Sequence, residues 1–404
     1  MDIRPILSTL RRHKTAAALI VLEVALTCAI VSNALFLITE RLQRMEVPTG
    51  LAESELVTLR LGTIARVDNA DVLTRQDMAT LRALPGVRGA TALNQLPFGR
   101  SASNSALRLD PDQTDATLVV STYFAGDDAL ATLGLRLVEG RDFLPDERTT
   151  VTAVRGGEGA PPRAVMLDRA TAERLYPGRS AIGQDVYVFG NAPLRIVGIV
   201  ERLLVPHFGG PEGDWVLITP AQPTYREGSY VLRVDPSRRQ DVLTEAVAAL
   251  EALDARRVVT DQGLFSDRRL AHFEQDRWMT WLLAATCLAL PVVTAFGIVG
   301  LASFWVQQRT RMIGVRRALG ASRRQVLGYF QTENFLLTGM GIALGRAGAY
   351  ASNHVLMTEY EMQRLPWVYL PVGAATLWLL GQVAVLGPAR RAAALPPVVV
   401  MRGA

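Results

Sequence analysis

Four long apolar segments, one near the start of the chain and three near its end, constrain the fold more than any other feature. A helix that crosses the hydrocarbon core of a bilayer needs about 20 apolar residues. The segments that reach or nearly reach this length cover residues 15–39, 278–308, 331–357 and 365–389 of the 404-residue chain. We therefore expect an α+β membrane protein with four transmembrane helices and a large extracytoplasmic α+β domain between the first two.

The first apolar segment resembles a secretory signal peptide in one respect, since basic residues precede it. It is longer than such a peptide, carries Glu23 within its apolar stretch and lacks a clear small-x-small cleavage site. We therefore expect it to stay in the protein as a membrane anchor. Residues 1–45 then comprise a basic N-terminal stretch and the first transmembrane helix.

Basic residues cluster in three places, and such clusters orient a membrane protein because they stay in the cytoplasm. They precede the first span, fill the connection between the second and third spans, and follow the fourth. With four spans, all three clusters lie on one side, which predicts cytoplasmic termini and an extracytoplasmic domain. The clusters are Arg4, Arg11, Arg12 and Lys14, then Arg309, Arg311, Arg316, Arg317, Arg323 and Arg324, then Arg390, Arg391 and Arg402.

The long middle of the chain contains two similar stretches, each with the pattern of a strand, a helix and a second strand. A strand-rich insertion, about residues 118–219, separates them. This arrangement predicts a core domain over residues 46–263 with two subdomains, one inserted in the other. The expected elements are residues 56–61, 76–84, 87–93, 230–234, 240–253 and 256–260, with inserted strands at 135–138, 165–167, 185–188 and 194–200.

Polar, helix-compatible residues adjoin two of the spans. Residues 39–45 continue the first span, and residues 264–277 run directly into the second. Two helices that leave the membrane together predict a stalk that carries the extracytoplasmic domain. Pro291 lies inside the second span, where proline removes a backbone hydrogen bond and should kink the helix.

The chain lacks the residues of the common catalytic and metal sites. Its single lysine, Lys14, has no glycine-rich turn before it, which excludes a P-loop. The histidines are scattered without metal-ligand spacing, and Cys28 and Cys287 both lie in apolar segments. We therefore expect no catalytic residue, no metal, no bound cofactor and no nucleic-acid partner.

The connection between the second and third spans contains a short helical pattern. Met312, Val315 and Leu319 recur at helical spacing, and Gly320 suits a helix C-terminus. Ser322 and Gln325 have the spacing of a capping box for the next helix. We expect an amphipathic helix against the membrane face, which is either a simple positive-inside loop or a docking helix for an acidic soluble partner.

The same connection carries a family resemblance. Residues 311–321, Arg-Met-Ile-Gly-Val-Arg-Arg-Ala-Leu-Gly-Ala, resemble the Arg-Glu-Ile-Gly-x-Arg-Arg-Ala-x-Gly-Ala motif of the MacB/FtsX family of ABC-transporter permeases. Met312 departs from the usual glutamate, which fits the divergent half of a heterodimer. Further resemblance to this family's second motif and periplasmic core domain is found at residues 388–393 with Pro396, and at 123–143, 164–168, 175–178, 182–183 and 196–198.

This resemblance implies a permease subunit that couples ATP hydrolysis in a separate cytoplasmic ATPase to movements of the periplasmic domain. ATP and magnesium would bind to that ATPase and not to this chain. Residues 264–404 would form the stalk and an FtsX-like domain. The residues implied to contact the ATPase are Arg311, Met312, Ile313, Gly314, Arg316, Arg317, Leu319 and Gly320.

The resemblance also implies a bacterial inner-membrane location and a second permease chain in a homodimer or heterodimer. A tripartite exporter of this type further needs a periplasmic adaptor and an outer-membrane channel. The residues leave one alternative open, a membrane-anchored ligand-binding or signalling protein that regulates a partner without transport. A membrane-bound enzyme is a third reading, and it lacks a nucleophile–base or metal motif.

Two charges and one small-residue face lie within the apolar segments. A charge in mid-span costs roughly 2.5–3.5 kcal/mol on insertion scales, so Glu23 and Arg346 should face protein or water. We expect them to snorkel or to pair at an interface, with a direct substrate role as the alternative. Gly341, Gly345 and Ala349 give the third span a face for close helix packing, within the chain or in a dimer.

Overall fold

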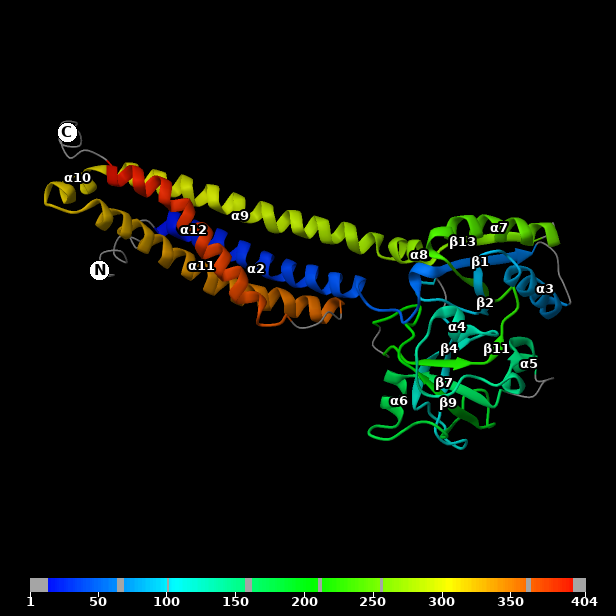
Figure 1. The fold of residues 1–404 in the computed structure, drawn as a ribbon. Helices are drawn as coiled ribbons and strands as arrows, with labels where there is room; N and C mark the ends of the chain where they lie inside the picture. Colours follow the sequence, from blue (N-terminus) through cyan, green and yellow to red (C-terminus); the bar gives the residue numbers. More distant parts are fainter. Residues whose placement is uncertain are drawn as a thin grey trace. The chain divides into compact units, whose positions relative to one another are not determined.

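The computed structural model describes residues 14–63, 69–99, 102–156, 162–209, 213–254, 257–360 and 365–394. The predicted basic residues Arg4, Arg11, Arg12 and Arg402, together with Pro396, lie outside these ranges. The chain divides into two compact units (Figure 1). We call Met1–Glu46 with Gln275–Ala404 the membrane unit, and Val47–Glu274 the α+β unit.

All secondary-structure elements described in the membrane unit are helices. Three helices are long and apolar enough to cross a membrane, namely α2 (Lys14–Met45), α9 (Glu274–Gln308) and α12 (Tyr369–Ala394). The helix α11 (Arg323–Tyr360) is the longest, but Glu333, Arg346 and many small polar residues lower its apolar character. That α11 is a fourth span stays a prediction. The short α10 (Thr310–Ala318) lies between α9 and α11, and α9 continues through Pro291 as one helix.

The helices α2 and α11 pack closely against each other in the membrane unit. A Cβ atom on Gly341 would lie 2.7 Å from Cβ of Val24, so the backbones approach closely at this glycine. Further along, the Asn33 side-chain amide donates to the Ala349 carbonyl over 3.2 Å. A buried core joins these two helices to parts of α9, α11 and α12, and includes Ile20, Val24, Cys28, Ile298, Leu337, Ile342, Leu377 and Val385.

The α+β unit contains two sheets, and the first confirms the predicted pair of strand–helix–strand stretches. Its strands are antiparallel, in the order β13-β1-β12-β2. Alternate side chains such as Leu59 and Leu232 pack against two helices that cover one face. The elements are β1 (Leu56–Thr63), α3 (Ala70–Arg82), β2 (Val87–Leu93), β12 (Ser229–Val234), α7 (Arg239–Leu253) and β13 (Arg257–Leu264).

The second sheet is mixed and has the order β3-β4-β10-β7-β9-β5, with β8 beside β9. It begins at β3, which precedes the predicted start of the insertion at residue 118. Its strands are β3 (Asn104–Leu107), β4 (Leu118–Phe124), β5 (Leu137–Gly140), β7 (Ala164–Asp168), β8 (Asp185–Val186), β9 (Leu194–Val200) and β10 (Val216–Thr219). A separate small pair is β6 (Thr149–Thr150) with β11 (Ala221–Gln222). The associated helices are α4 (Ala129–Leu133), α5 (Val151–Gly156) and α6 (Arg169–Leu175), and α8 (Phe265–His272) follows β13.

A buried carboxylate starts α6 at the end of β7. The Asp168 side chain accepts the Thr171 backbone N–H at 3.1 Å and the Thr171 hydroxyl at 2.5 Å. The same hydroxyl oxygen accepts the Val216 N–H of β10 at 2.8 Å. Asp168 therefore caps α6 and links it to the sheet. Burial raises the pKa of Asp168 to about 6, although the Thr171 hydrogen bonds act in the opposite direction.

This carboxylate should make the stability of the α+β unit depend on pH. Because the folded-state pKa of about 6 exceeds the ordinary value of 3.8, the folded state holds the proton more tightly. The protonated side chain therefore contributes up to about 3 kcal/mol to the free energy of unfolding. This contribution is fully present below pH 4 and is lost as the pH rises through 6. Asp168→Asn, which cannot ionise, should remove this loss in unfolding measurements from pH 4 to 7. An unchanged pH profile would contradict this, and Asp112→Asn at an exposed carboxylate is the control.

Candidate functional site

The short helix α10 is present and ends where the sequence predicts. It begins after Arg309 and ends near Gly320, whose positive φ of 96° suits glycine. The predicted capping box of α11 is also confirmed. The Ser322 N–H donates to the Gln325 side chain at 2.8 Å, and the Gln325 N–H donates to the Ser322 hydroxyl at 3.3 Å. Local sequence signals therefore fix the end of α10 and the start of α11.

The packing of α10 uses a different face from the predicted apolar stripe. Ile313 and Gly314 are the buried residues of this helix. The stripe of Met312, Val315 and Leu319 is exposed by 39%, 47% and 83%, respectively. Its predicted contact with the membrane surface stays a prediction. Within the described residues, α10 thus presents apolar side chains that no neighbouring helix covers.

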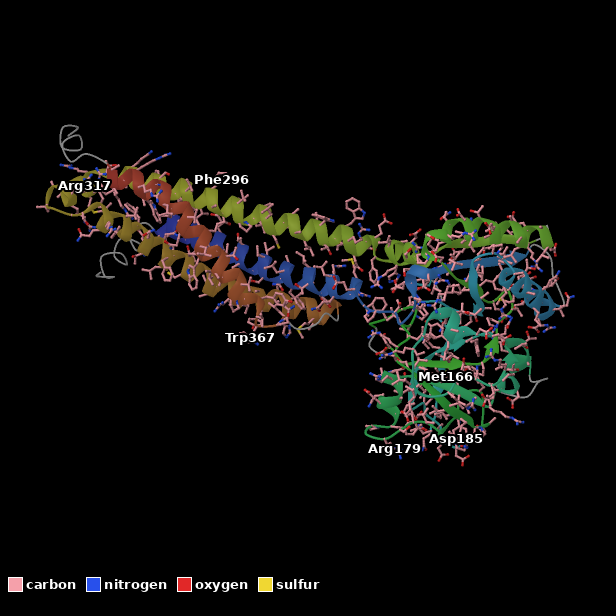
Figure 2. All side chains as sticks on the ribbon, viewed as in Figure 1. Met166, Arg179, Asp185, Phe296, Arg317 and Trp367 are labelled. Carbon is pink, nitrogen blue, oxygen red and sulfur yellow. The ribbon has the colours of Figure 1, made fainter. Side chains whose placement is uncertain are left out.

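The arginines of this connection fall into two groups. The guanidinium carbon of Arg316 lies 5.2 Å from the centre of the Tyr329 ring, a cation–π contact that holds α10 on α11. Arg311 is exposed, and Arg317 is half-buried at the end of the membrane unit that carries α10 (Figure 2). Arg316 is therefore partly engaged within the chain, whereas Arg311 borders the exposed stripe.

A buried ion pair joins the end of α9 to α11. Nη1 of Arg309 lies 3.1 Å and 2.9 Å from the two carboxylate oxygens of Glu333. The two side chains are 7% and 2% exposed, and the guanidinium also lies over the Trp305 ring. Arg309 was predicted to be a charge of the loop, and the pair with Glu333 was not predicted. Its only signal was a carboxylate, Glu333, at the start of a long apolar segment.

The two predicted intramembrane charges occupy different surroundings. Glu23 of α2 is half-buried, and a Cβ on Gly297 of α9 would lie within 2.6 Å of both its carboxylate oxygens. The Glu23 carboxylate therefore occupies the space that a side chain at position 297 would fill. Arg346 of α11 is exposed. Among the described residues, Glu23 and Arg346 form no ion pair with each other.

The small-residue face of α11 packs within the chain. A Cβ on Gly345 would lie 2.6 Å from both the Ala25 carbonyl oxygen and Cβ of Cys28. Gly341 meets Val24 in the same way, and Ala349 is fully buried. These residues form the contact of α11 with α2.

The helix α11 also carries buried polar atoms that no sequence pattern predicted. In the described chain, Nδ2 of Asn334 and Oγ1 of Thr338 are buried without a hydrogen-bond partner. Both lie beside Gly381 of α12, where an added Cβ would be 3.1 Å from each. A hydroxyl pair, Thr27 with Thr294 at 2.8 Å, links α2 to α9. No group of three metal-ligating side chains occurs among the described residues.

Two family models match the chain. The MacB-like periplasmic core domain matches residues 18–252, and the FtsX-like permease C-terminal domain matches residues 284–397. The first covers more than half of the chain and includes the whole second sheet. The match to the FtsX-like permease C-terminal domain includes α10, α11 and α12.

Curated relatives agree with these matches. The macrolide export ATP-binding/permease protein MacB of Marinobacter nauticus is 27% identical over 65% of this chain and 40% of its own length. The protein of the same description from Chromobacterium violaceum is 28% identical over 69% of this chain and 42% of its own length. The chain thus spans about two fifths of the length of these relatives. A solved periplasmic region of MacB from Actinobacillus actinomycetemcomitans is 15% identical, and the match has a TM-score of 0.34. This match covers 54% of this chain and 94% of the solved chain.

Proposed function

The chain belongs to the MacB/FtsX family of ABC-transporter permeases, and from this premise we propose that it couples ATP hydrolysis by a separate cytoplasmic subunit to movements of its periplasmic domain. The movements would drive export or efflux. The family membership makes the chain an inner-membrane permease with a periplasmic domain, and does not favour a regulator without transport. The observation that carries the coupling proposal is the exposed apolar stripe of α10 beside Arg311.

The proposed ATPase contact is the stripe of Met312, Val315 and Leu319. These side chains lie on the outer surface of a helix whose inner side is anchored by Ile313 and by Arg316 on Tyr329. A partner that covers them would offer an apolar groove, and an acidic rim would complement the neighbouring arginines. Met312, in place of the family's usual glutamate, adds to the apolar character of this surface.

The proposed transmission uses the Arg309–Glu333 pair. Arg309 stands at the junction of α9 and α10, and Glu333 lies on α11. A displacement of α10 by the ATPase would therefore move the ends of both long helices together. The α9 helix follows α8 of the α+β unit directly in the chain, which supports transfer to the periplasmic domain.

The remaining partners are also part of the proposal. ATP and magnesium would bind to the ATPase, because Lys14 is the chain's single lysine and has no P-loop context. A second permease chain would complete the transporter, and Glu23 and Arg346 would face it, water or lipid headgroups. A periplasmic adaptor and an outer-membrane channel would join in a tripartite exporter. Both termini would then be cytoplasmic.

The coupling proposal predicts a large effect of charge in the α10 stripe. The double variant Val315→Asp/Leu319→Asp should reduce co-purification with the partner ATPase at least tenfold, because two carboxylates would have to be desolvated in the contact. Permease-stimulated ATP hydrolysis should fall in parallel. The measurement is co-expression with a candidate ATPase from the same gene neighbourhood, followed by pull-down from membranes.

Two further variants make this test specific. Arg311→Glu should weaken the same association, because it places a carboxylate against the proposed acidic rim. Val72→Asp, at an exposed apolar residue of α3, should have no effect. Full association of both the double variant and Arg311→Glu with the ATPase would refute the proposed role of α10.

A further inference from the structure

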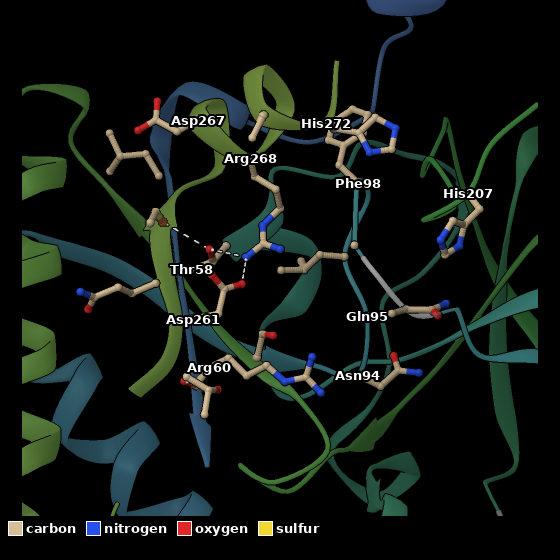
Figure 3. Close-up of a pocket in the computed structure, with 18 residues that line it drawn as sticks. Thr58, Arg60, Asn94, Gln95, Phe98, His207, Asp261, Asp267, Arg268 and His272 are labelled. Carbon is tan, nitrogen blue, oxygen red and sulfur yellow. Dashed lines mark hydrogen bonds and ion pairs between the residues drawn. The ribbon is translucent and has the colours of Figure 1, made fainter. Parts of the chain in front are cut away.

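The first sheet of the α+β unit has one face covered by helices and one polar face. Leu59 and Leu61 of β1 pack in the core toward α3 and α7. The alternate residues Thr58 and Arg60 point to the other face, since successive side chains of a strand alternate. A pocket of about 920 Å³ lies over this polar face (Figure 3). Its walls come from the loop after β2, the end of β13, α8 and His207.

Two arginines and two aspartates line this pocket, and only one arginine is paired with a described carboxylate. Nη2 of Arg268 donates to the Asp261 carboxylate at 2.6 Å, so these two charges neutralise each other. Asp267, the other lining carboxylate, lies at the upper edge of Figure 3, away from Arg60. Arg60 is exposed, forms no ion pair with any described residue and extends across the pocket floor toward Asn94 (Figure 3).

The amide side chains near Arg60 are already engaged. Asn94 donates to the Thr122 carbonyl at 3.0 Å and accepts the Phe124 N–H at 2.9 Å. Gln95 donates to the Ser121 hydroxyl at 3.0 Å and accepts the Ser103 N–H. The amides are therefore held in place by the second sheet, and the free hydrogen-bonding capacity at the floor belongs to the Arg60 guanidinium.

A rigid aromatic wall faces this floor. Phe98 lines the pocket, and its φ of 61° is unusual for a residue other than glycine. Packing holds this conformation, because the rings of Phe208, Phe265 and Phe273 lie within about 6 Å of the Phe98 ring centre. The His272 ring, also at the pocket, lies 5.1 Å from the same centre.

We propose that this pocket binds an organic anion with a flat apolar body and a single carboxylate or phosphate group. The anionic group would pair with Arg60, and the flat body would lie against Leu96, Phe98 and His272. The volume of about 920 Å³ is in the range of pockets for drug-sized molecules. A guanidinium is suited to bidentate pairing with either anionic group.

The test is calorimetric titration of the full chain in phosphatidylcholine nanodiscs, with empty nanodiscs as the blank. The probes are 2-naphthoate, 2-naphthyl phosphate and the neutral 2-naphthol. At least one of the two organic anions should bind, and 2-naphthol should bind about tenfold or more weakly, as expected for loss of a charged hydrogen bond. Whichever anion binds more tightly identifies the preferred anionic group.

Matched arginine variants assign the binding to this pocket. Arg60→Gln should weaken anion binding about tenfold or more, and Arg60→Lys should weaken it less, because lysine keeps the charge but loses the bidentate geometry. Arg75→Gln, at an exposed arginine of α3 on the opposite face of the sheet, should bind like the unmodified chain. Unchanged thermal unfolding of the variants shows that they are folded.

Three results would overturn the proposal: no binding of either anion, equal binding of 2-naphthol, or equal losses in Arg60→Gln and Arg75→Gln. The titration contains no ATPase. The result is therefore independent of the proposed coupling through α10, and either proposal can fail while the other stands.

Discussion

Replacing Glu333 by leucine should lower the stability of the membrane unit by about 3–5 kcal/mol, because the Arg309 guanidinium stays buried without its carboxylate. The two groups are almost fully excluded from solvent, and Nη1 of Arg309 contacts both oxygens. Nη2 of Arg309 has no hydrogen-bond partner in the described chain, so only the contact with the Trp305 ring would remain to stabilise the charge. The measurement is equilibrium unfolding of the purified chain in mixed micelles.

Two controls separate the ion pair from a general effect of substitution. The double variant Arg309→Met/Glu333→Leu should recover most of the stability, since replacing both partners of a buried pair by apolar residues is often neutral. Glu245→Gln breaks the exposed pair with Arg238 and should cost less than about 1 kcal/mol. A single Glu333→Leu variant as stable as the unmodified chain would show that the pair carries no net stability.

Gly345→Leu should separate α2 from α11 and abolish most of the folded membrane unit. The new Cβ would meet the Ala25 carbonyl oxygen at 2.6 Å, and a backbone atom cannot move aside without displacing α2. Forcing added carbon atoms into a packed core typically costs 1–3 kcal/mol, and the fixed backbone places this site at or above that range. The measurement is the yield of monodisperse protein by size-exclusion chromatography in detergent.

Gly300→Leu is the matched control for this prediction. Gly300 also lies in a long apolar helix, α9, but nothing lies within 4 Å of an added Cβ there. We expect this variant to behave like the unmodified chain, because leucine suits a membrane helix surface. Equal yields from Gly345→Leu and Gly300→Leu would mean that the α2–α11 contact tolerates a larger separation.

The elements of the α+β unit could be read from the sequence wherever a local pattern decides them. The strand β9, at Leu194–Val200, has the predicted bounds because it is an apolar run interrupted only by the exposed Arg195. The helix α3 begins earlier than predicted, at Ala70, because Leu73 joins the core and the Thr74 hydroxyl accepts the Tyr225 N–H at 2.9 Å. Such contacts depend on residues far away in the chain, as does the strand order β13-β1-β12-β2.

The candidate site shows the same division between local and distant determinants. The capping box at Ser322 and Gln325 is a matter of spacing and was predicted. Helical spacing placed Met312 and Leu319 on one face but could not tell what that face contacts, and the buried residue proved to be Ile313. The Arg309–Glu333 pair depends on α9 meeting α11, which no local pattern encodes.

The glycine contacts between α2 and α11 have a mechanical consequence. Gly341 lies at Val24, Gly345 at Cys28, and Ala349 at Asn33, so both sequences advance in the same direction along the contact. Pushing α11 toward its C-terminal end by one turn, about 5.4 Å, while α2 stays in place would bring Leu337 to the position of Gly341 against Val24, where a leucine side chain does not fit. The two helices should therefore move together when a force pushes α11 along its axis in this direction.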